Sequence, residues 1–203
     1  MMQVFFDFDG TLIDSRKRLY ELFKHLVPES HFTFDEYWEL KRAGIGHSEI
    51  LKKKWGYTQG QIIQFTNNWM RLIEEEDWIK YDVPIDGVTE YLEFLSNKNI
   101  ELYLITNRQK KEILIDQIKH LEWERFFKKI LVTEQKITKS DCIKPYIINN
   151  NNCFLIADTG QDIKEGNSLG IHTVAVSSGF LSKEKLEQYN PESIIDDVTK
   201  FII

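Results

Sequence analysis

The motif Asp7-Phe8-Asp9-Gly10-Thr11 follows an apolar segment that is typical of a buried strand. Side chains two residues apart point to the same face of a strand, so Asp7 and Asp9 share one face if the strand runs through Phe8. Two carboxylates at this spacing repel each other unless a cation or a proton lies between them. Gly10 lets the chain turn away sharply, and Thr11 adds a hydroxyl group. The motif predicts a metal site, and an ordinary strand end with solvated acids is the alternative.

Further polar motifs lie at the ends of other apolar segments. They are Leu104-Ile105-Thr106-Asn107, a lysine between two later strands, and Asp158-Thr159-Gly160-Gln161-Asp162. The carboxyl ends of parallel strands meet at one edge of a sheet, which is where open α/β sheets carry their chemistry. We therefore expect all of these motifs to lie together.

The order of these motifs resembles that of the haloacid dehalogenase (HAD)-like hydrolase superfamily, and within it subfamily I with a helical type 1 cap, the phosphoglycolate phosphatase-like group. The resemblance covers nearly the whole chain. It implies a phosphatase that uses Mg²⁺ and forms an aspartyl-phosphate intermediate. It also implies a small phosphorylated metabolite as the substrate.

The resemblance assigns roles to the acidic residues. Asp7 is the nucleophile, and Asp9 is the general acid that protonates the leaving oxygen and then activates water. Mg²⁺ is held by the carboxylates of Asp7 and Asp158 and by the backbone carbonyl of Asp9, all hard oxygen ligands of the kind that this ion prefers. Asp162 supports the site by holding a metal-bound water or by orienting the lysine; alternatively, it only favours a helix N-terminus.

Thr106 and Asn107 are the expected phosphate-binding residues. The hydroxyl group of Thr106 and the neighbouring backbone N–H groups would receive the transferring phosphoryl group at the start of the next helix. A helix cap is the alternative explanation for the threonine.

Three lysines compete for the active-site position: Lys136, Lys139 and Lys144. Lys144 is followed by proline, as is frequent in the family, but too few residues then remain for a helix and a turn before the next strand. Lys139 precedes Ser140, a plausible N-cap, and leaves room for a helix of about ten residues. We choose Lys139, whose charge would offset phosphate oxygens and help to keep Asp7 ionised.

The pattern of apolar residues predicts an α/β fold, with a mostly parallel sheet flanked by helices and an inserted small all-α domain. The resemblance implies that the sheet is Rossmann-like and that the inserted domain is a cap domain. The core domain comprises residues 1–14 and 82–203, and the helical cap comprises residues 15–81. Within the cap we expect helices up to residue 28 and at 34–42, 48–55 and 59–75. In the core we expect strands at 101–105, 129–132, 153–157 and 173–176, and helices at 110–120, 140–149 and 162–169.

The cap supplies candidates for substrate specificity, of which Arg42 and His47 are the foremost. Each has a simpler explanation, because Arg42 can lie on a solvated helix face and His47 can cap a helix. The cap is also rich in aromatic residues, which more often form a core than a ligand platform.

Composition restricts the partners. The chain has 203 residues, a formal net charge of -6 and two cysteines. This balance does not suggest a nucleic-acid surface, and the cysteines lack the density of a disulfide scaffold. We see no cleavage signal and no apolar run of membrane-spanning length. We therefore expect a cytoplasmic protein without a membrane or nucleic-acid partner, present as a monomer or homodimer.

Two other functions remain open at this point. One is phosphoglucomutase-like phosphoryl transfer, which uses the same aspartyl-phosphate. The other is a non-catalytic phosphate-binding or regulatory module, since a fold does not fix a function.

Overall fold

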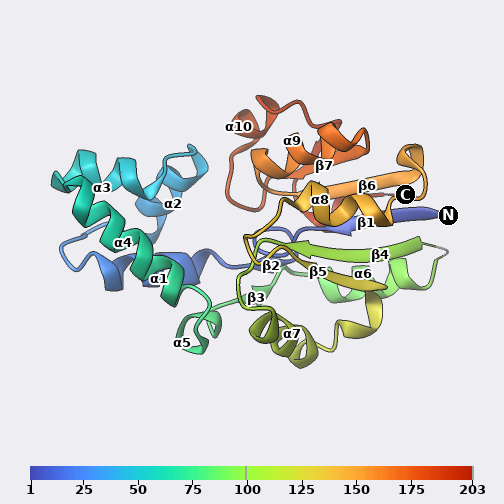
Figure 1. The fold of residues 1–203 in the computed structure, drawn as a ribbon, viewed down its shortest axis with the longest axis horizontal. Coiled ribbons are helices and arrows are strands. Elements are labelled where there is room, and N and C mark those ends of the chain that lie inside the picture. The colour runs from blue at the N-terminus through green and yellow to red at the C-terminus, as the bar shows by residue number, and fades with distance from the viewer. Residues whose placement is uncertain (99, 203) are drawn as a thin grey trace. The chain divides into compact units, whose positions relative to one another are not determined.

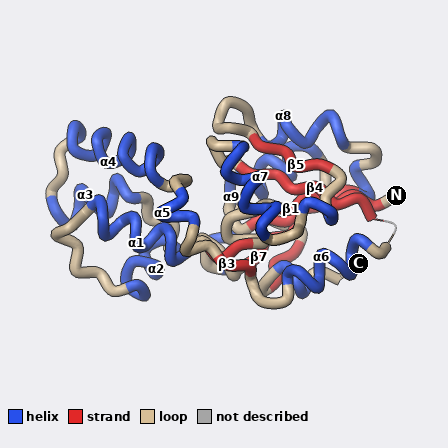
Figure 2. Tube along the Cα trace, turned by 90° about the horizontal axis from the view of Figure 1, so that it is seen from below, coloured by secondary structure: helices blue, strands red, loops and turns tan. Residues whose placement is uncertain are grey.

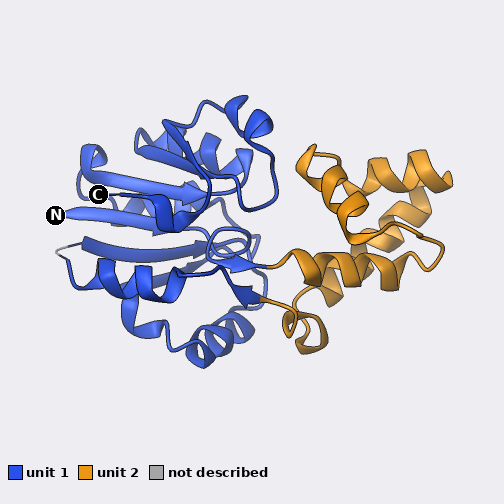
Figure 3. Ribbon diagram, turned by 180° about the vertical axis from the view of Figure 1, so that it is seen from behind, with its two compact units in different colours: residues 1–14, 83–203 blue, residues 15–82 orange. Residues whose placement is uncertain are grey.

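The computed structural model describes residues 1–98 and 100–202 (Figure 1). The chain forms two compact units. Unit 1 contains Met1–Asp14 and Val83–Ile203, and unit 2 contains Ser15–Asp82 (Figure 3).

Unit 1 is built on a six-stranded sheet in the order β5-β4-β1-β6-β7-β8. Every neighbouring pair in this sheet is parallel. The strands are β1 (Met2–Phe6), β4 (Ile100–Thr106), β5 (Lys129–Val132), β6 (Cys153–Ala157), β7 (His172–Val176) and β8 (Ser193–Ile195). Because β1 lies between β4 and β6, the residues that follow these three strands are neighbours at the carboxyl edge of the sheet.

Helices cover both faces of this sheet (Figure 2). They are α6 (Val88–Ser96), α7 (Lys111–His120), α8 (Lys139–Ile143), α9 (Gly160–Leu169) and α10 (Lys183–Glu187). Val4 and Phe6 of β1 belong to the same buried cluster as residues of α6 and α7. Phe5, which points the opposite way, packs in a cluster with Ile143 of α8. Burial of both faces explains why the strands are continuous apolar runs.

A two-stranded antiparallel ribbon lies where the chain leaves unit 1 and returns to it. It consists of β2 (Ile13–Asp14) and β3 (Val83–Pro84). Short 3-10 helices complete unit 1: η1 (Glu124–Phe126), η2 (Lys144–Tyr146), η3 (Asn150–Asn152) and η4 (Val198–Lys200).

Unit 2 is helical throughout its regular elements. These are α1 (Arg16–Leu26), α2 (Phe34–Arg42), α3 (His47–Trp55), α4 (Gln59–Leu72) and α5 (Glu76–Ile79). Thr33 and Thr58 begin α2 and α4 with capping boxes, in which the threonine side chain accepts from the backbone three residues later. Phe23 lies at the centre of an aromatic core, with its ring 4.9 Å from that of Tyr37 and 6.1 Å from that of Phe65. Asp82 belongs to unit 2, where its Oδ1 lies 3.0 Å from Nε of Arg18.

The predicted α/β fold with an inserted helical segment is confirmed, with several corrections to the elements. The helix expected at 140–149 is wrong, because α8 ends at Ile143 and a 3-10 turn follows. Pro145 has no N–H group, and its ring would clash with the preceding helical turn. The N-cap of α8 is Thr138 rather than Ser140, since the Thr138 hydroxyl accepts from the backbone of Asp141.

Other differences concern the ends of elements. The helix expected at 59–75 ends earlier, at Leu72. The sequence analysis missed the ribbon β2–β3, the short strand β8 and helix α10. In the part of the chain that the structure describes, no helix is long and apolar enough to span a bilayer.

Candidate active site

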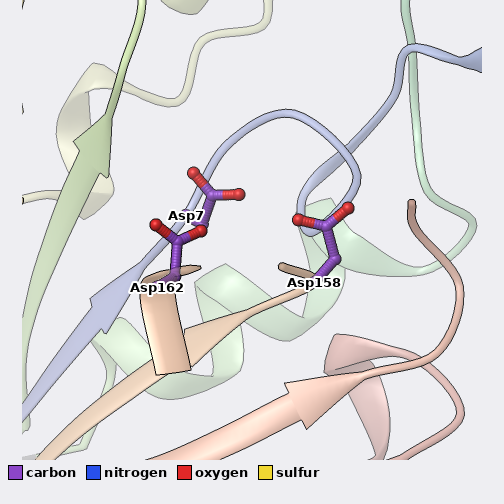
Figure 4. Close-up of side chains that lie close together, drawn as sticks. All are labelled: Asp7, Asp158 and Asp162. Carbon is purple, nitrogen blue, oxygen red and sulfur yellow. The ribbon is translucent and has the colours of Figure 1, made fainter. Parts of the chain in front are cut away.

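Three carboxylates converge at the carboxyl edge of the sheet. Asp7 follows β1, Asp158 follows β6, and Asp162 lies in the first turn of α9. Each offers one oxygen, and these oxygens lie within 4.8 Å of one another. Figure 4 shows the three side chains grouped together, with Asp7 on the segment after β1 and the two other acids on the segment that runs from β6 into α9. All three are buried, so their charges are poorly screened by water.

Backbone encloses Asp158 from two sides. Gly10 has φ +88°, and a Cβ added there would lie 2.0 Å from Oδ2 of Asp158. A Cβ on Gly179 would lie 2.1 Å from the same oxygen. Glycine is therefore required at both positions for the chain to approach the carboxylate so closely. The N–H group of Phe180 donates to Oδ2 of Asp158 at 2.7 Å.

Lys139 lies between two of the acids. Its Nζ donates to Oδ1 of Asp7 at 2.6 Å and lies 2.9 Å from Oδ1 of Asp162. Only 2 % of the lysine side chain is exposed. Burial lowers the pKa of Lys139, but the charges of Asp162 and Asp7 more than offset this, and the net result is a raised pKa. Lys139 is therefore an ammonium group fixed beside Asp7.

Asp7 and Asp158 have raised pKa values, so they are less readily ionised than free carboxyl groups. Burial raises the pKa of Asp7 to about 6, although the charge of Lys139 opposes this shift. Burial and the charge of Asp7 raise the pKa of Asp158 well above its usual range. The cluster has three carboxyl groups and one lysine, so it carries an excess of negative charge when all three carboxyl groups are ionised.

The residues of the cluster fit a hard divalent cation. Mg²⁺ binds carboxylate and carbonyl oxygens and usually keeps several waters. Oδ1 of Asp158 is buried and has no hydrogen-bond partner among the described residues. Such an atom is costly to bury, and a cation at this position would remove the cost. Asp162, which the sequence analysis gave a supporting role, belongs to the same group of possible ligands.

The carboxylate of Asp9 lies outside that group and contacts Arg108. The guanidinium donates twice, from Nε to Oδ2 at 2.6 Å and from Nη2 to Oδ1 at 2.8 Å. Arg108 also lies over the ring of Phe8, 5.4 Å from its centroid. The sequence analysis missed Arg108, although its position directly after the Thr106-Asn107 motif was a usable signal.

Thr106 and Asn107 occupy the loop after β4. The Thr106 hydroxyl accepts from the backbone N–H of Arg108 at 3.3 Å, and Oδ1 of Asn107 accepts from the hydroxyl of Thr133 at 2.8 Å. Helix α7 begins only at Lys111. The expectation that Thr106 stands at the start of a helix is therefore wrong, because a loop separates it from α7.

The two other lysines considered for the site are exposed. Lys136 lies 3.1 Å from a carboxylate oxygen of Glu134, and Lys144 lies in the 3-10 helix η2. Lys139, in contrast, contacts two of the three clustered acids, Asp7 and Asp162.

Unit 2 carries the two residues that we considered for substrate specificity. Arg42 ends α2 and is half-buried. His47 begins α3, and its Nε2 lies 2.9 Å from the hydroxyl of Tyr37. The His47 ring centroid lies 4.2 Å from that of Trp69. Burial, with the nearby charge of Lys41, lowers the pKa of His47 well below its usual range. His47 is therefore a neutral member of the aromatic core of unit 2.

Comparison with known proteins gives a consistent picture. A sequence profile described as haloacid dehalogenase-like hydrolase matches residues 4–176. The phosphoglycolate phosphatase of Pseudomonas savastanoi pv. phaseolicola is 25% identical over 217 residues, which cover 98% of this chain and 78% of that protein. Pyrophosphatase PpaX of Oceanobacillus iheyensis is 22% identical, over 98% of this chain and 94% of its own length. A solved haloacid dehalogenase-like family hydrolase from Streptococcus pneumoniae superposes with a TM-score of 0.78 at 22% identity, covering 97% of this chain and 94% of that chain.

Proposed function

Because the chain belongs to the haloacid dehalogenase-like hydrolase family, we propose that it is a magnesium-dependent phosphatase that hydrolyses a small phosphomonoester through an aspartyl-phosphate on Asp7. Its relatives are named phosphatases, and the chain is a phosphoric monoester hydrolase. The convergence of Asp7, Asp158 and Lys139 is the observation on which the proposal depends.

Asp7 is suited to attack phosphorus. One of its oxygens accepts from Lys139 at 2.6 Å, and the other accepts from the Thr11 hydroxyl at 3.4 Å. These contacts fix the carboxylate, and the ammonium group favours its ionised, nucleophilic form. An oxygen of Asp7 forms the new bond to phosphorus while the bond from phosphorus to the leaving oxygen breaks.

Asp9 would act as the general acid and then as the general base. It donates a proton to the leaving oxygen and then takes one from the water that attacks the aspartyl-phosphate, which frees phosphate and restores Asp7. The ion pair with Arg108 holds Asp9 as a carboxylate, the form that accepts a proton from water. The first step needs the protonated form, so we expect the contact with Arg108 to loosen when the substrate binds.

Magnesium would be held by the carboxylates of Asp7 and Asp158 and by the backbone carbonyl of Asp9, with Asp162 supporting the site. When bound, it would offset the charge of the phosphate oxygens. The buried Oδ1 of Asp158, which has no hydrogen-bond partner among the residues described, supports this assignment.

The transferring phosphoryl group would be bound by Lys139 and by the loop that follows β4. Lys139 supplies a full charge in a buried setting, where electrostatic stabilisation is strongest. Thr106 and Asn107 supply a hydroxyl, an amide and backbone N–H groups. The hydrogen bond between Asn107 and Thr133, the residue that follows β5, fixes the side chain of Asn107.

Unit 2 would serve as the cap that recognises the rest of the substrate. Arg42 is the stronger of the two candidates for this task, because the ring of His47 is engaged inside the aromatic core. Two of the relatives are named phosphoglycolate phosphatase and pyrophosphatase. We therefore propose a small phosphorylated metabolite as the substrate.

Release of phosphate from a panel of sugar, nucleotide and short-acid phosphates, with Mg²⁺ and with EDTA, tests the proposal. We expect Mg²⁺-dependent turnover and a phosphorylated peptide containing Asp7 in the quenched reaction. Asp9→Asn should lower kcat by roughly 10²- to 10⁴-fold. A folded wild-type protein that releases no phosphate from any member of the panel would overturn the proposed function.

A further inference from the structure

We propose that Glu165 is a positioning residue that fixes Lys139 in the active site by binding the backbone next to it. The N–H group of Ser140, the residue after Lys139, donates to Oε2 of Glu165 at 2.8 Å. The side chain of Glu165 contacts the backbone of Ser140 and the side chain of Gln161 rather than the ammonium group of Lys139. The inference rests on the proposed function, because it explains how the catalytic lysine is held in place.

The segment that carries Lys139 needs such an anchor. Helix α8 has five residues, and a helix leaves its first N–H groups without partners inside the helix. The Thr138 side chain satisfies the N–H of Asp141, and Glu165 satisfies that of Ser140. The loop before the helix contains two residues with positive φ, Glu134 (51°) and Gln135 (56°), so it is not an extension of regular structure.

One face of α9 binds the side chain of Lys139 and the backbone beside it. Asp162 and Glu165 are three residues apart and therefore lie on the same side of the helix. Oδ1 of Asp162 lies 2.9 Å from Nζ of Lys139, and Glu165 binds the N–H of the next residue. Gln161 donates to the other oxygen of Glu165 at 3.0 Å, which orients the carboxylate.

Helix α9, which carries Glu165, is packed tightly against the sheet. It has ten residues, and its Ile163 is fully buried against the sheet. Gly166 packs so closely on β7 that an added Cβ would lie 2.5 Å from Cγ2 of Thr173. A helix held this tightly can determine where the shorter α8 lies. Through its hydrogen bond to the N–H group of Ser140, Glu165 therefore holds Lys139 at a fixed position relative to α9.

Placement of the ammonium group matters because it contacts two acids at once. A shift of about 1 Å in a catalytic group can reduce a rate by about a hundredfold. Loss of one anchor among several should have a smaller effect. We expect Glu165→Ala to lower kcat by about tenfold, with a much smaller change in KM.

The experiment compares Glu165→Ala with Glu165→Gln, whose side-chain oxygen still accepts from Ser140. The matched control is Glu112→Ala, which removes an exposed glutamate from α7. We expect Glu165→Gln to retain most of the wild-type kcat and the control to retain all of it. If Glu165→Ala does not fold, Glu165→Asp provides the shortened side chain for the same comparison.

A double-mutant cycle with Lys139→Ala separates positioning from general stability. If Glu165 acts through Lys139, Glu165→Ala should have no further effect on kcat in the Lys139→Ala background, measured on an activated aryl phosphate. Equal effects in both backgrounds, or wild-type kcat in folded Glu165→Ala, would overturn the inference.

Hydrogen exchange of the Ser140 amide gives a readout that does not depend on activity. We expect protection in the wild type and in Glu165→Gln, and faster exchange in Glu165→Ala. Equal exchange in all three proteins would overturn the inference even if no substrate were found. An inactive wild type with the expected exchange pattern would instead count against the proposed function alone.

Discussion

Removing the divalent cation should make the stability of the protein fall as pH rises, with Asp7 as a main cause. Burial raises its pKa from 3.8 to about 6 in the folded protein. Between these values the folded protein keeps a proton that the unfolded chain has lost, so the free energy of unfolding decreases with pH. The contribution is present below about pH 4 and lost above about pH 6. A shift of about two pKa units corresponds to about 3 kcal/mol.

A matched variant separates this effect from the titration of groups that do not interact with Asp7. Asp7→Asn keeps the shape of the side chain but cannot titrate. The contact with Lys139 is weaker in this variant. This changes the free energy of unfolding by about the same amount at every pH, so it does not affect the slope of that free energy against pH. Asp158 adds to the wild-type slope, because burial and the charge of Asp7 raise its pKa as well. We expect the wild type to lose at least about 2 kcal/mol more than the variant between about pH 4 and 7, or roughly 4–8 °C in Tm.

Thermal unfolding followed by circular dichroism, in EDTA and then in Mg²⁺, measures both effects. Mg²⁺ must displace the proton from Asp7, and at pH 5 only about one Asp7 in eleven is ionised. Mg²⁺ should therefore raise Tm more at pH 7.5 than at pH 5. Parallel curves for the two proteins in EDTA would refute the reasoning, as would a Mg²⁺ effect of equal size at both pH values.

The remaining predictions concern three side chains. Lys139→Ala should lower kcat/KM by at least about a hundredfold, because it removes a buried charge from the site. Lys144→Ala should leave kcat/KM unchanged. Equal losses of kcat/KM for the two variants in steady-state assays would contradict our choice of lysine. Arg108→Lys should slow hydrolysis of the aspartyl-phosphate, because it removes the bidentate contact with Asp9. Rapid-quench kinetics should then show a burst of the leaving group. A single linear phase with wild-type kcat would show that Arg108 has no role in turnover. His47→Leu should cost about 0.5–3 kcal/mol in thermal unfolding and leave KM unchanged, and a raised KM at unchanged Tm would return His47 to the substrate-binding residues.

Strand positions were predictable from the sequence because a buried parallel strand is apolar on both faces. The strands expected at 129–132 and 153–157 have those bounds in the structure. Helix α2 likewise has the predicted bounds, since its capping box marks the start. Strand β8 has only three residues and an exposed first position, and no periodicity can be read over so short a run.

The candidate site was predictable only where residues lie close to the end of an apolar strand. Asp7 and Asp158 meet that condition, and parallel pairing of β1 with β6 then brings them together. Arg108 and Asp9 are 99 residues apart, and no local pattern indicates that they pair. Lys139 was selected on the premise of a ten-residue helix and a Ser140 cap, both of which are wrong. The contact with Glu165 of a separate helix could not be read from spacing either.

The acidic groups at this edge of the sheet are not all paired with a positive charge. Lys139 contacts Asp7 and Asp162, and Arg108 contacts Asp9. Asp158 is held by a backbone N–H and, among the residues described, has no ion pair within 4.0 Å. A divalent cation would therefore be needed most at Asp158, whose Oδ1 has no hydrogen-bond partner among the residues described. Because Lys139 is held by both Asp7 and Asp162, we expect it to keep these two contacts when a cation binds at Asp158.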